Sequence, residues 1–520
     1  MHRPTRRTLL RSMVAAAGSA GAYRTMDALG MLGSGTTHAA ALDLPPGSGE
    51  GGRVVILGAG VSGLAAAYEM SRAGWHCTVL EASGRPGGRN LTARGGDVLT
   101  ERGMRQEVCF DREDHLYANL GPARIPYHHR TVLGYCKAFG IDLEVFTNDN
   151  RAAFFHNRER FGGRPVAARR VLTDMRGYVA ELLAKAVDRG ALDAELTADD
   201  KESVRAMLQS FGGLKDDGSY AGSNRAGYRG AQTHAGMEAG ENEEKLDFGE
   251  LLGADFWHYK LHFSHFLDQN PTLFQPVGGM DAIVRAFAER VGHLVRHDCV
   301  VEQVRRQDDG VRILWRGADG AERAALADYA ICTIPAPVLK DIPNDFSPEI
   351  QAALESLEFV EAVKVAFQAR RRFWEEDSAI YGGISWTDND ITQVWYPCNG
   401  YHRPGGVLVG AYIWDREPGL RYSAMSAPER LRAALDEGEA LHPGWAGEMA
   451  CGISRAWLNV PFQKGGWPRR NPDAAAALRL GDGPFRFAGD QVTALPGWQE
   501  GALLAAHAAA GAIHRRFSGR

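Results

Sequence analysis

An arginine held between two prolines is the first pattern in this sequence that could do chemistry. Arg124 lies in NLGPARIPYHHR (119–130), with Pro122 before it and Pro126 after it. Proline fixes its own φ and restricts the preceding residue, so the backbone on both sides of Arg124 is stiff. A guanidinium on such a segment could bind a carboxylate through two parallel hydrogen bonds. A surface turn with an ordinary salt bridge fits the same residues.

A glycine-rich stretch near the N-terminus has the spacing of a dinucleotide-binding loop. Gly58, Gly60 and Gly63 form G-x-G-x-x-G between a β-branched run at 54–57 and a helix-forming run at 64–72. The first glycine permits a tight turn, and the second lets the backbone approach a pyrophosphate. The third lets the helix pack closely on the strand, with the helix N-terminus facing the phosphates.

An acidic residue completes this pattern. Gly74 stands where a helix ends, and the following stretch HCTVLEA reads as a second strand that reaches Glu81. A carboxylate at that point would accept hydrogen bonds from the adenosine ribose. Strand, glycines, helix and acid together predict a dinucleotide site at the start of an α/β domain.

The net charge and the spacing of the cysteines argue against several classes of partner and site. The chain has 520 residues, 44% hydrophobic and 24% charged, with a net charge of −5, so neither nucleic acid nor a membrane surface is an expected partner. The seven cysteines lie far apart without a Cys-x-x-Cys pair, which argues against a zinc site and against a disulfide framework. We expect most of them to be small buried residues and expect no metal site.

The first 45 residues differ from the rest of the chain. Arg6 and Arg7 precede a short run rich in Ala and Gly, and Ala39 and Ala41 have the small-x-small spacing of a cleavage site. The apolar run is too short to cross a bilayer. It therefore predicts a twin-arginine-type signal that exports the protein without a membrane anchor. A disordered tail is the alternative.

Two further segments resemble the flavin-containing amine oxidase superfamily. RPGGR contributes Gly87, Gly88 and Arg89 directly after the first fingerprint, and FRFAGDQVTALPGWQEGALLAAHAAAGAIHRRF (485–517) matches the closing segment of that superfamily. The resemblance implies that FAD is the cofactor. Some relatives attach FAD to a cysteine in the closing segment. No cysteine follows Cys451 here, so we expect FAD to be bound non-covalently.

The resemblance also implies a set of cofactor-contacting residues. Glu81 and Val301 fall at the adenosine end, and the start of the last helix faces the flavin, where negative charge gathers on reduction. The expected contacts are Gly58, Gly60, Val61, Ser62, Gly63, Glu81, Ala82, Gly88, Arg89, Gly121, Pro122, Ala123, Arg124, Val301, Asp490, Gly497, Trp498, Gln499, Glu500, Gly501 and Ala502.

Within the superfamily, the segment around Arg124 resembles the Gly-Pro-x-Arg-x-Pro segment of L-amino acid oxidases. The resemblance implies that Arg124 binds the substrate α-carboxylate, which a lysine would do less well. It also implies that Lys364, in a strand predicted over 363–369, is catalytic and holds a water against the flavin. Tyr412 and Trp498 would form aromatic walls, with Gly497 also at the substrate.

The resemblance assigns no site role to several other charged or polar segments. Arg370 to Arg372 are expected to form an exposed charged face, and 101–115 to form a hairpin over the site. His258, His262 and His265 are candidates for a base that some relatives carry, but ordinary helix-face histidines are the favoured interpretation. Residues 195–250 match nothing.

The expected fold is α/β (α+β), with a Rossmann-like FAD-binding domain, a discontinuous substrate domain and a helical cap. The FAD domain combines 52–115, 275–335 and 480–518. The substrate domain combines 116–125 with 335–480, and the cap spans 125–270.

The expected reaction is the FAD-dependent oxidative deamination of an L-amino acid by dioxygen, giving a 2-oxo acid, ammonia and hydrogen peroxide. A monoamine or polyamine oxidase and an amino acid 2-monooxygenase are the alternatives within the superfamily. A flavin-binding protein without turnover is the alternative from another class. A homodimer is a further expectation.

Overall fold

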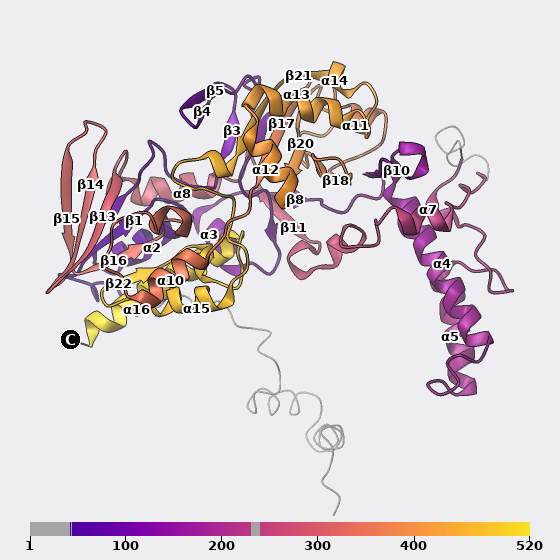
Figure 1. Cartoon of the computed structure of the whole chain (residues 1–520), viewed down its shortest axis with the longest axis horizontal. Coiled ribbons are helices and arrows are strands. Elements are labelled where there is room, and N and C mark those ends of the chain that lie inside the picture. The colour runs from indigo at the N-terminus through magenta and orange to yellow at the C-terminus, as the bar shows by residue number, and fades with distance from the viewer. Residues whose placement is uncertain (1–41, 43, 230–239, 520) are drawn as a thin grey trace, which may run out of the picture. The chain divides into compact units, whose positions relative to one another are not determined.

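The computed structural model describes residues 42, 44–229 and 240–519, so the predicted export signal lies outside the described residues except for its last positions. The described chain combines a parallel sheet with a larger, mainly antiparallel sheet (Figure 1). Among the described residues, no helix combines the length and apolar character needed to cross a membrane.

A five-stranded parallel sheet draws its strands from three separate stretches of the chain. Its order is β12 (Val295–Arg296), β2 (His76–Leu80), β1 (Arg53–Leu57), β16 (Tyr329–Cys332) and β22 (Phe485–Phe487). Adjacent strands pair in parallel throughout. The helices α2 (Val61–Arg72), α3 (Arg130–Phe139), α8 (Ala282–Val291) and α16 (Gln499–Ser518) accompany this sheet. The predicted α/β fold class is confirmed.

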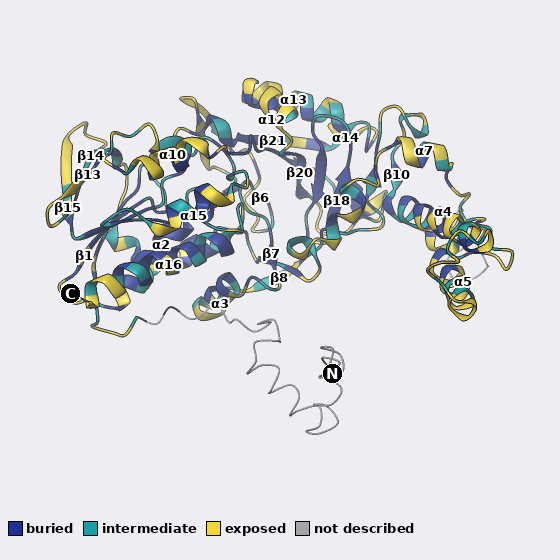
Figure 2. Ribbon diagram, turned by 60° about the horizontal axis from the view of Figure 1, so that its bottom comes forward, coloured by how far each residue is buried: buried dark blue, intermediate teal, exposed yellow. Residues whose placement is uncertain are grey.

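The second sheet has seven strands and contributes the other wall of the site. Its order is β10 (Val166–Ala167), β9 (Phe154–Phe155), β18 (Gly383–Trp386), β19 (Gln393–Tyr396), β20 (Gly406–Ile413), β17 (Val363–Ala369) and β21 (Met449–Ala456). Every residue of β17 is buried, and Figure 2 shows the strands of this sheet largely in dark blue. An apolar run buried on both faces is typical of a central strand.

The remaining elements build the surroundings of these two sheets. The smaller strands are β3 (Thr92–Arg94), β4 (Val98–Glu101), β5 (Met104–Glu107), β6 (Tyr117–Asn119), β7 (Ile125–Pro126), β8 (Leu143–Phe146), β11 (Leu273–Pro276), β13 (Val300–Gln307), β14 (Gly310–Arg316) and β15 (Glu322–Ala327). The other α-helices are α4 (Ala168–Asp188), α5 (Ala198–Gly212), α7 (Phe248–Gly253), α9 (Ala336–Leu339), α10 (Pro348–Ser356), α11 (Phe373–Glu376), α12 (Arg416–Ala424), α13 (Ala427–Gly438), α14 (Trp445–Glu448) and α15 (Pro472–Leu480). Two 3₁₀ turns, η3 (Lys260–His265) and η4 (Leu267–Gln269), follow α7.

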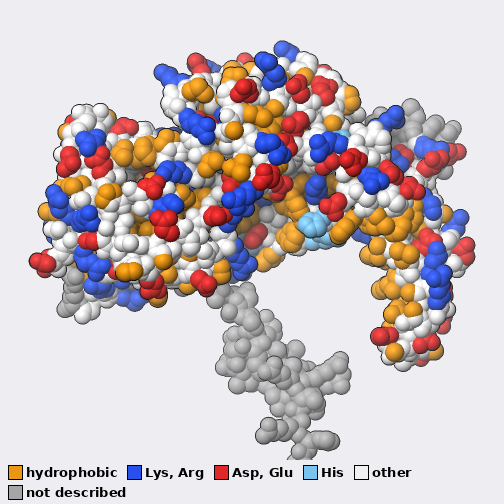
Figure 3. Space-filling model, in the orientation of Figure 1, with side chains coloured by type: hydrophobic (Ala, Val, Ile, Leu, Met, Phe, Trp, Pro, Cys, Tyr) orange, Lys and Arg blue, Asp and Glu red, His pale blue; other side chains and the backbone are white. Residues whose placement is uncertain are grey.

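The helices α4 and α5 pack on each other within the region expected to be a cap. Their buried contact includes Ala180, Ala184 and Leu208. Apolar side chains also remain exposed on both helices, and Figure 3 shows hydrophobic residues gathered along one side of this pair. The exposed members are Val179, Leu182, Leu183, Met207 and Phe211.

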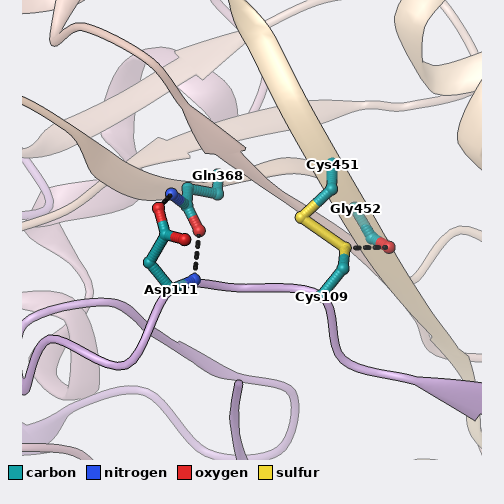
Figure 4. Close-up of a disulfide and its surroundings, with 5 residues drawn as sticks. All are labelled: Cys109, Asp111, Gln368, Cys451 and Gly452. Carbon is teal, nitrogen blue, oxygen red and sulfur yellow. Dashed lines mark hydrogen bonds between the residues drawn. A yellow bond between two sulfur atoms is a disulfide. The ribbon is translucent and has the colours of Figure 1, made fainter. Parts of the chain in front are cut away.

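A disulfide corrects one expectation from the sequence. Cys109, after β5, is bonded to Cys451 in β21 across 342 residues of sequence (Figure 4). Beside it, Gln368 of β17 exchanges hydrogen bonds with the backbone and side chain of Asp111. The other five cysteines, Cys77, Cys136, Cys299, Cys332 and Cys398, are free and buried, as expected.

Two expectations about charged segments were wrong in part, since Arg370 is exposed as expected but Arg372 is not. Arg372 is 1% exposed rather than part of a solvated face, because its guanidinium pairs with the buried Glu375 at 2.5 Å and donates to the carbonyl of Asn399. The hairpin β4–β5 does form, but not over the cavity described below. Glu101, next to the turn of the hairpin, pairs with Arg430 of α13 at 2.7 Å and accepts a hydrogen bond from the backbone N–H of Ala456, which holds the hairpin beside β21.

Candidate active site

A cavity of about 390 Å³ lies where the two sheets meet. Sequence-predicted residues line it from the first glycine loop to the last helix: Gly58, Gly60, Val61, Ser62, Glu81, Ala82, Gly88, Arg89, Gly121, Pro122, Val301, Lys364, Tyr412, Asp490, Gly497, Trp498, Gln499 and Ala502. Gly63, Ala123, Arg124, Glu500 and Gly501 were also predicted, but they do not line it.

The first glycine loop has the shape that a dinucleotide requires. Gly58 has a φ of +103°, and nothing lies within 4 Å of the position that a Cβ of Gly60 would take, so that position opens into the cavity. A Cβ on Gly63 would lie 2.0 Å from the carbonyl oxygen of Gly58. Gly63 therefore serves the close packing of α2 on β1 rather than the cavity wall, and α2 presents its N-terminus to the cavity.

Glu81 is fixed at the end of β2 by hydrogen bonds from the loops on either side. Its carboxylate accepts from the backbone N–H of Ala59 at 2.7 Å and from the hydroxyl of Ser83 at 2.6 Å. The side chain is buried yet borders the cavity, where its remaining lone pairs could accept ribose hydroxyls. Loop and acid together fit the adenosine diphosphate part of a flavin dinucleotide.

A partly buried ion pair joins the two cofactor segments that lie far apart in sequence. Arg89 pairs with Asp490 at 2.5 Å and also donates to the carbonyl of Gly466. The same Asp490 accepts from the backbone N–H of Gly497, which has a φ of +80°. These bonds fix the loop before α16 and leave the N-terminus of that helix directed at the cavity.

Glu500 and Gly501 have structural roles and do not line the cavity. The carboxylate of Glu500 accepts from the backbone N–H groups of Thr131 and Val132 at 3.0 and 2.9 Å, which caps the N-terminus of α3. A Cβ on Gly501 would lie 2.5 Å from the carbonyl oxygen of Leu495, so this glycine permits a close turn. The contact of either residue with the cofactor stays a prediction.

The amine of Lys364 is buried and has no carboxylate partner within the described part of the chain. It lies in β17 with 2% of its surface exposed, and its Nζ donates to the carbonyls of Asn119 and Gly121 at 2.9 and 2.7 Å. Burial, together with the positive charge of Arg124, lowers the pKa of Lys364 to about 7. A group with this pKa can change protonation at neutral pH, as an acid–base catalyst must.

Aromatic side chains surround Lys364 on the cavity side. Tyr412 pairs with Lys364 across β17 and β20, and the Nζ lies 4.3 Å from the centre of the tyrosine ring. Among the described residues the Tyr412 hydroxyl has no hydrogen-bond partner, and it is not sealed from solvent. Trp498, as predicted, lines the cavity, and Trp467 does so too, although no sequence pattern indicated it.

Arg124 lies beside the cavity rather than in its wall. Three aromatic rings pack around its guanidinium, those of Trp395, Trp498 and Phe263, with Cζ at 4.8, 5.2 and 5.8 Å from their centres. Burial lowers its pKa to about 10, while the charge of Asp268 acts in the opposite direction. No ion pair compensates it among the described residues.

The histidines that the sequence singled out do not line the cavity. His258, His262 and His265 are exposed, His258 in a turn and the other two in η3. The adjacent His128 and His129 are closer to the site, because their Nε2 atoms contact Asp268 at 3.0 and 3.3 Å and His129 packs edge-on against Trp498. The expectation of no metal site stays a prediction.

Comparison with characterised proteins agrees with this geometry. The flavin-dependent L-tryptophan oxidase RebO of Lentzea aerocolonigenes is 28% identical over 501 residues, covering 89% of this chain and 98% of the relative. An L-amino-acid oxidase of Mus musculus is 27% identical over 490 residues, covering 89% and 71%.

Solved structures of amine-oxidising enzymes share the fold. Cyclohexylamine oxidase from Brevibacterium oxydans superposes with a TM-score of 0.59 at 18% identity, covering 89% of this chain and 99% of the other. Putrescine oxidase bound to putrescine gives 0.58 at 19% identity, covering 90% and 99%. The family described as flavin containing amine oxidoreductase matches residues 61–514. The chain therefore belongs to this family, and its cofactor is a flavin.

Proposed function

We propose that this protein is an L-amino acid oxidase that converts its substrate to a 2-oxo acid, ammonia and hydrogen peroxide. The observation that carries the proposal is Arg124, a buried guanidinium beside the cavity that forms no ion pair with a carboxylate among the described residues. A free amino acid would supply the missing carboxylate, whereas a simple amine would not. The relatives named L-amino-acid oxidase support the same substrate class.

The flavin supplies the two-electron oxidation of the substrate Cα–N bond, with dioxygen as the final acceptor. Arg124 binds the carboxylate, and the Tyr412 hydroxyl, which is open to the cavity, can donate to the same group. Trp498 and Trp467 pack against the substrate and exclude water. Lys364 in its neutral form accepts a proton, directly or through a water, so that the substrate reacts as a neutral amine.

The cofactor is proposed to be FAD bound without a covalent link. Of the free cysteines, Cys299 lines the cavity, and its backbone N–H donates to the carbonyl of Glu81 at the adenosine end. Acid precipitation of the purified protein should release all of the flavin into the supernatant. Flavin that stays in the pellet would show a covalent link.

Export through a twin-arginine pathway and a homodimeric state are proposals that rest on the sequence. A fusion of residues 1–45 to a folded reporter should be exported, and the Arg6→Lys, Arg7→Lys double variant should not be. Export of the double variant by the same route would overturn the assignment. Light scattering of the purified protein tests the dimer.

The substrate class is tested with Arg124→Ala. Peroxide release from a panel of twenty L-amino acids first identifies the best substrate. On that substrate the variant should lose about 2–4 orders of magnitude in kcat/KM, because leaving a desolvated charge unpaired typically costs about 3–5 kcal/mol. Arg124→Lys should recover only part of the loss, since an ammonium cannot form the planar fork.

The control is the decarboxylated amine with the same side chain, measured as a substrate or as a competitive inhibitor. Arg124→Ala should change its constants little, and flavin content should stay normal. Equal losses for amine and amino acid, with flavin still bound, would mean that Arg124 is structural and that the proposed substrate class is wrong.

A further inference from the structure

Among the described residues, one glutamine accepts hydrogen bonds from the guanidinium of Arg124. Gln269, in η4, lies 145 positions away in sequence, and its Oε1 accepts from both Nε and Nη2 of Arg124 at 2.9 and 2.5 Å. Every nitrogen of a guanidinium is a donor, so the amide oxygen must face it. Gln269 therefore occupies the Nε–Nη2 edge of the arginine.

The other edge of the same guanidinium remains open. Nη1 of Arg124 has no hydrogen-bond partner among residues 44–229 and 240–519, and it is not among the polar atoms sealed from solvent. A carboxylate can bind a guanidinium bidentately through Nη1 and Nη2 as well as through the side edge. The contact with Gln269 thus orients the arginine and leaves a free edge for an anionic ligand.

Gln269 is uncharged, and for the binding of an anionic ligand this matters more than the shape of its side chain. A glutamate at position 269 would form a buried bidentate ion pair and neutralise the arginine before the substrate arrives. An amide offers the same oxygen without the charge. Asp268, whose charge acts on Arg124, is engaged elsewhere, because hydrogen bonds from His129 and His128 lower its pKa and hold it ionised.

The glutamine is itself held in place. Its backbone carbonyl accepts from Nδ2 of Asn148 at 2.7 Å, and the preceding Asp268 fastens η4 to the loop before α3 through the two histidines. Rings of Trp395 and Trp498 pack on the arginine from other directions. The pair is therefore pre-organised, which reduces the entropy lost when a ligand binds.

We propose that Gln269 is a positioning residue that gives the site its selectivity for substrates with a carboxylate. It orients Arg124 while leaving the positive charge uncompensated and the Nη1–Nη2 edge free. This inference rests on the proposed role of Arg124 as the carboxylate-binding residue. It adds that the neutral state of position 269 is required for that role.

Gln269→Glu provides the sharpest test, because it keeps the shape and changes only the charge. The KM for the best L-amino acid should rise at least thirtyfold, with a smaller change in kcat. Titration of the oxidised holoenzyme with benzoate, followed by flavin absorbance, should give a Kd raised at least tenfold. The inhibition constant of the decarboxylated amine should change less than threefold.

Two further variants separate charge from orientation. Gln269→Ala removes the contact but adds no negative charge, so its KM should rise less than that of Gln269→Glu. Gln307→Glu makes the same change on the surface, since Gln307 is exposed at the end of β13, and it should leave every constant unchanged. Normal flavin content in all variants verifies folding.

Other outcomes would show whether the inference about Gln269 or the proposed function is wrong. If Gln269→Glu leaves KM and the benzoate Kd within threefold while Arg124→Ala lowers kcat/KM as expected, the inference about Gln269 is wrong and the proposed function stands. If amine and amino acid suffer equally, or if Gln269→Ala is the more damaging variant, the charge of position 269 is not what matters. If Arg124→Ala itself has no selective effect, the proposed function fails.

Discussion

Replacing Lys364 with methionine should remove a pH dependence that the structure predicts for the wild-type enzyme. The lysine is almost fully buried, and its Nζ donates hydrogen bonds to two backbone carbonyls but to no carboxylate of residues 44–229 and 240–519. Its pKa is lowered to about 7. Methionine has a similar length and cannot titrate. The comparison therefore isolates the proton of one amine.

The expected magnitude follows from that pKa. Its ordinary value is 10.5, so the drop to about 7 corresponds to about 5 kcal/mol acting against the charged form, chiefly through burial. With a pKa of about 7, the neutral fraction grows from about 9% at pH 6 to about 91% at pH 8. If the neutral amine is the active form, kcat/KM of the wild type should rise about tenfold over this interval.

The assay is peroxide release under subsaturating L-amino acid between pH 5.5 and 9. Lys364→Met should be slower at neutral pH and should lack the rising limb near pH 7. Thermal or denaturant unfolding offers an independent readout. Because the folded pKa lies below the unfolded one, the unfolded state binds more protons between about pH 7 and 10.5, so Lys364 makes the free energy of unfolding increase with pH there. The variant should lose this increase.

A rising limb with the same midpoint in Lys364→Met would refute the assignment, because another group would then be titrating. Tyr412 is not a candidate, since burial raises its pKa to about 12. Lys364→Met could instead lose the rising limb of kcat/KM while the pH dependence of its free energy of unfolding stays as in the wild type. Lys364 would then act in the reaction, but the lowered pKa of its buried amine would not be the cause.

Three further outcomes are expected from residues around the site. The Cys109→Ser, Cys451→Ser double variant should unfold at lower temperature with unchanged flavin content, because the bond closes a 342-residue loop and such bonds contribute up to about 5 kcal/mol. Glu500→Gln should lower the free energy of unfolding by about 1–2 kcal/mol through the weakened cap of α3, again with flavin retained, as absorbance would show. Gly63→Ala should lose flavin, since its Cβ would meet the Gly58 carbonyl at 2.0 Å and displace the loop.

Local sequence patterns were enough to predict the elements that carry the cofactor. The strand expected over 54–57, the helix that follows it and the strand expected over 363–369 are found as β1, α2 and β17. Each depends on the spacing of apolar residues or glycines within about a dozen positions. The resemblance to a family then assigned distant segments to the same cofactor site, which no local pattern could do.

Contacts between distant segments were not predictable in this way. Arg372 looked exposed because it follows two other arginines, yet folding brings Glu375 and the carbonyl of Asn399 to its guanidinium. The partner of Cys109 lies 342 residues away and the partner of Arg124 lies 145 away. Glu500 resembled a cofactor ligand by position, but its carboxylate caps another helix. In each case the pairing depends on tertiary structure, not on neighbouring residues.

Two buried cations, Arg124 and Lys364, lie close enough for the charge of one to lower the pKa of the other. A bound carboxylate on Arg124 would offset that charge and so raise the pKa of Lys364. The pH profile of kcat/KM reports the free enzyme, whereas that of kcat reports the complex. The limb of kcat should therefore lie at higher pH than the limb of kcat/KM for an L-amino acid, and Gln269→Glu should shift the limb of kcat/KM upward as well. Coincident limbs in the wild type would mean that the substrate carboxylate binds too far from Arg124 to change the field at Lys364.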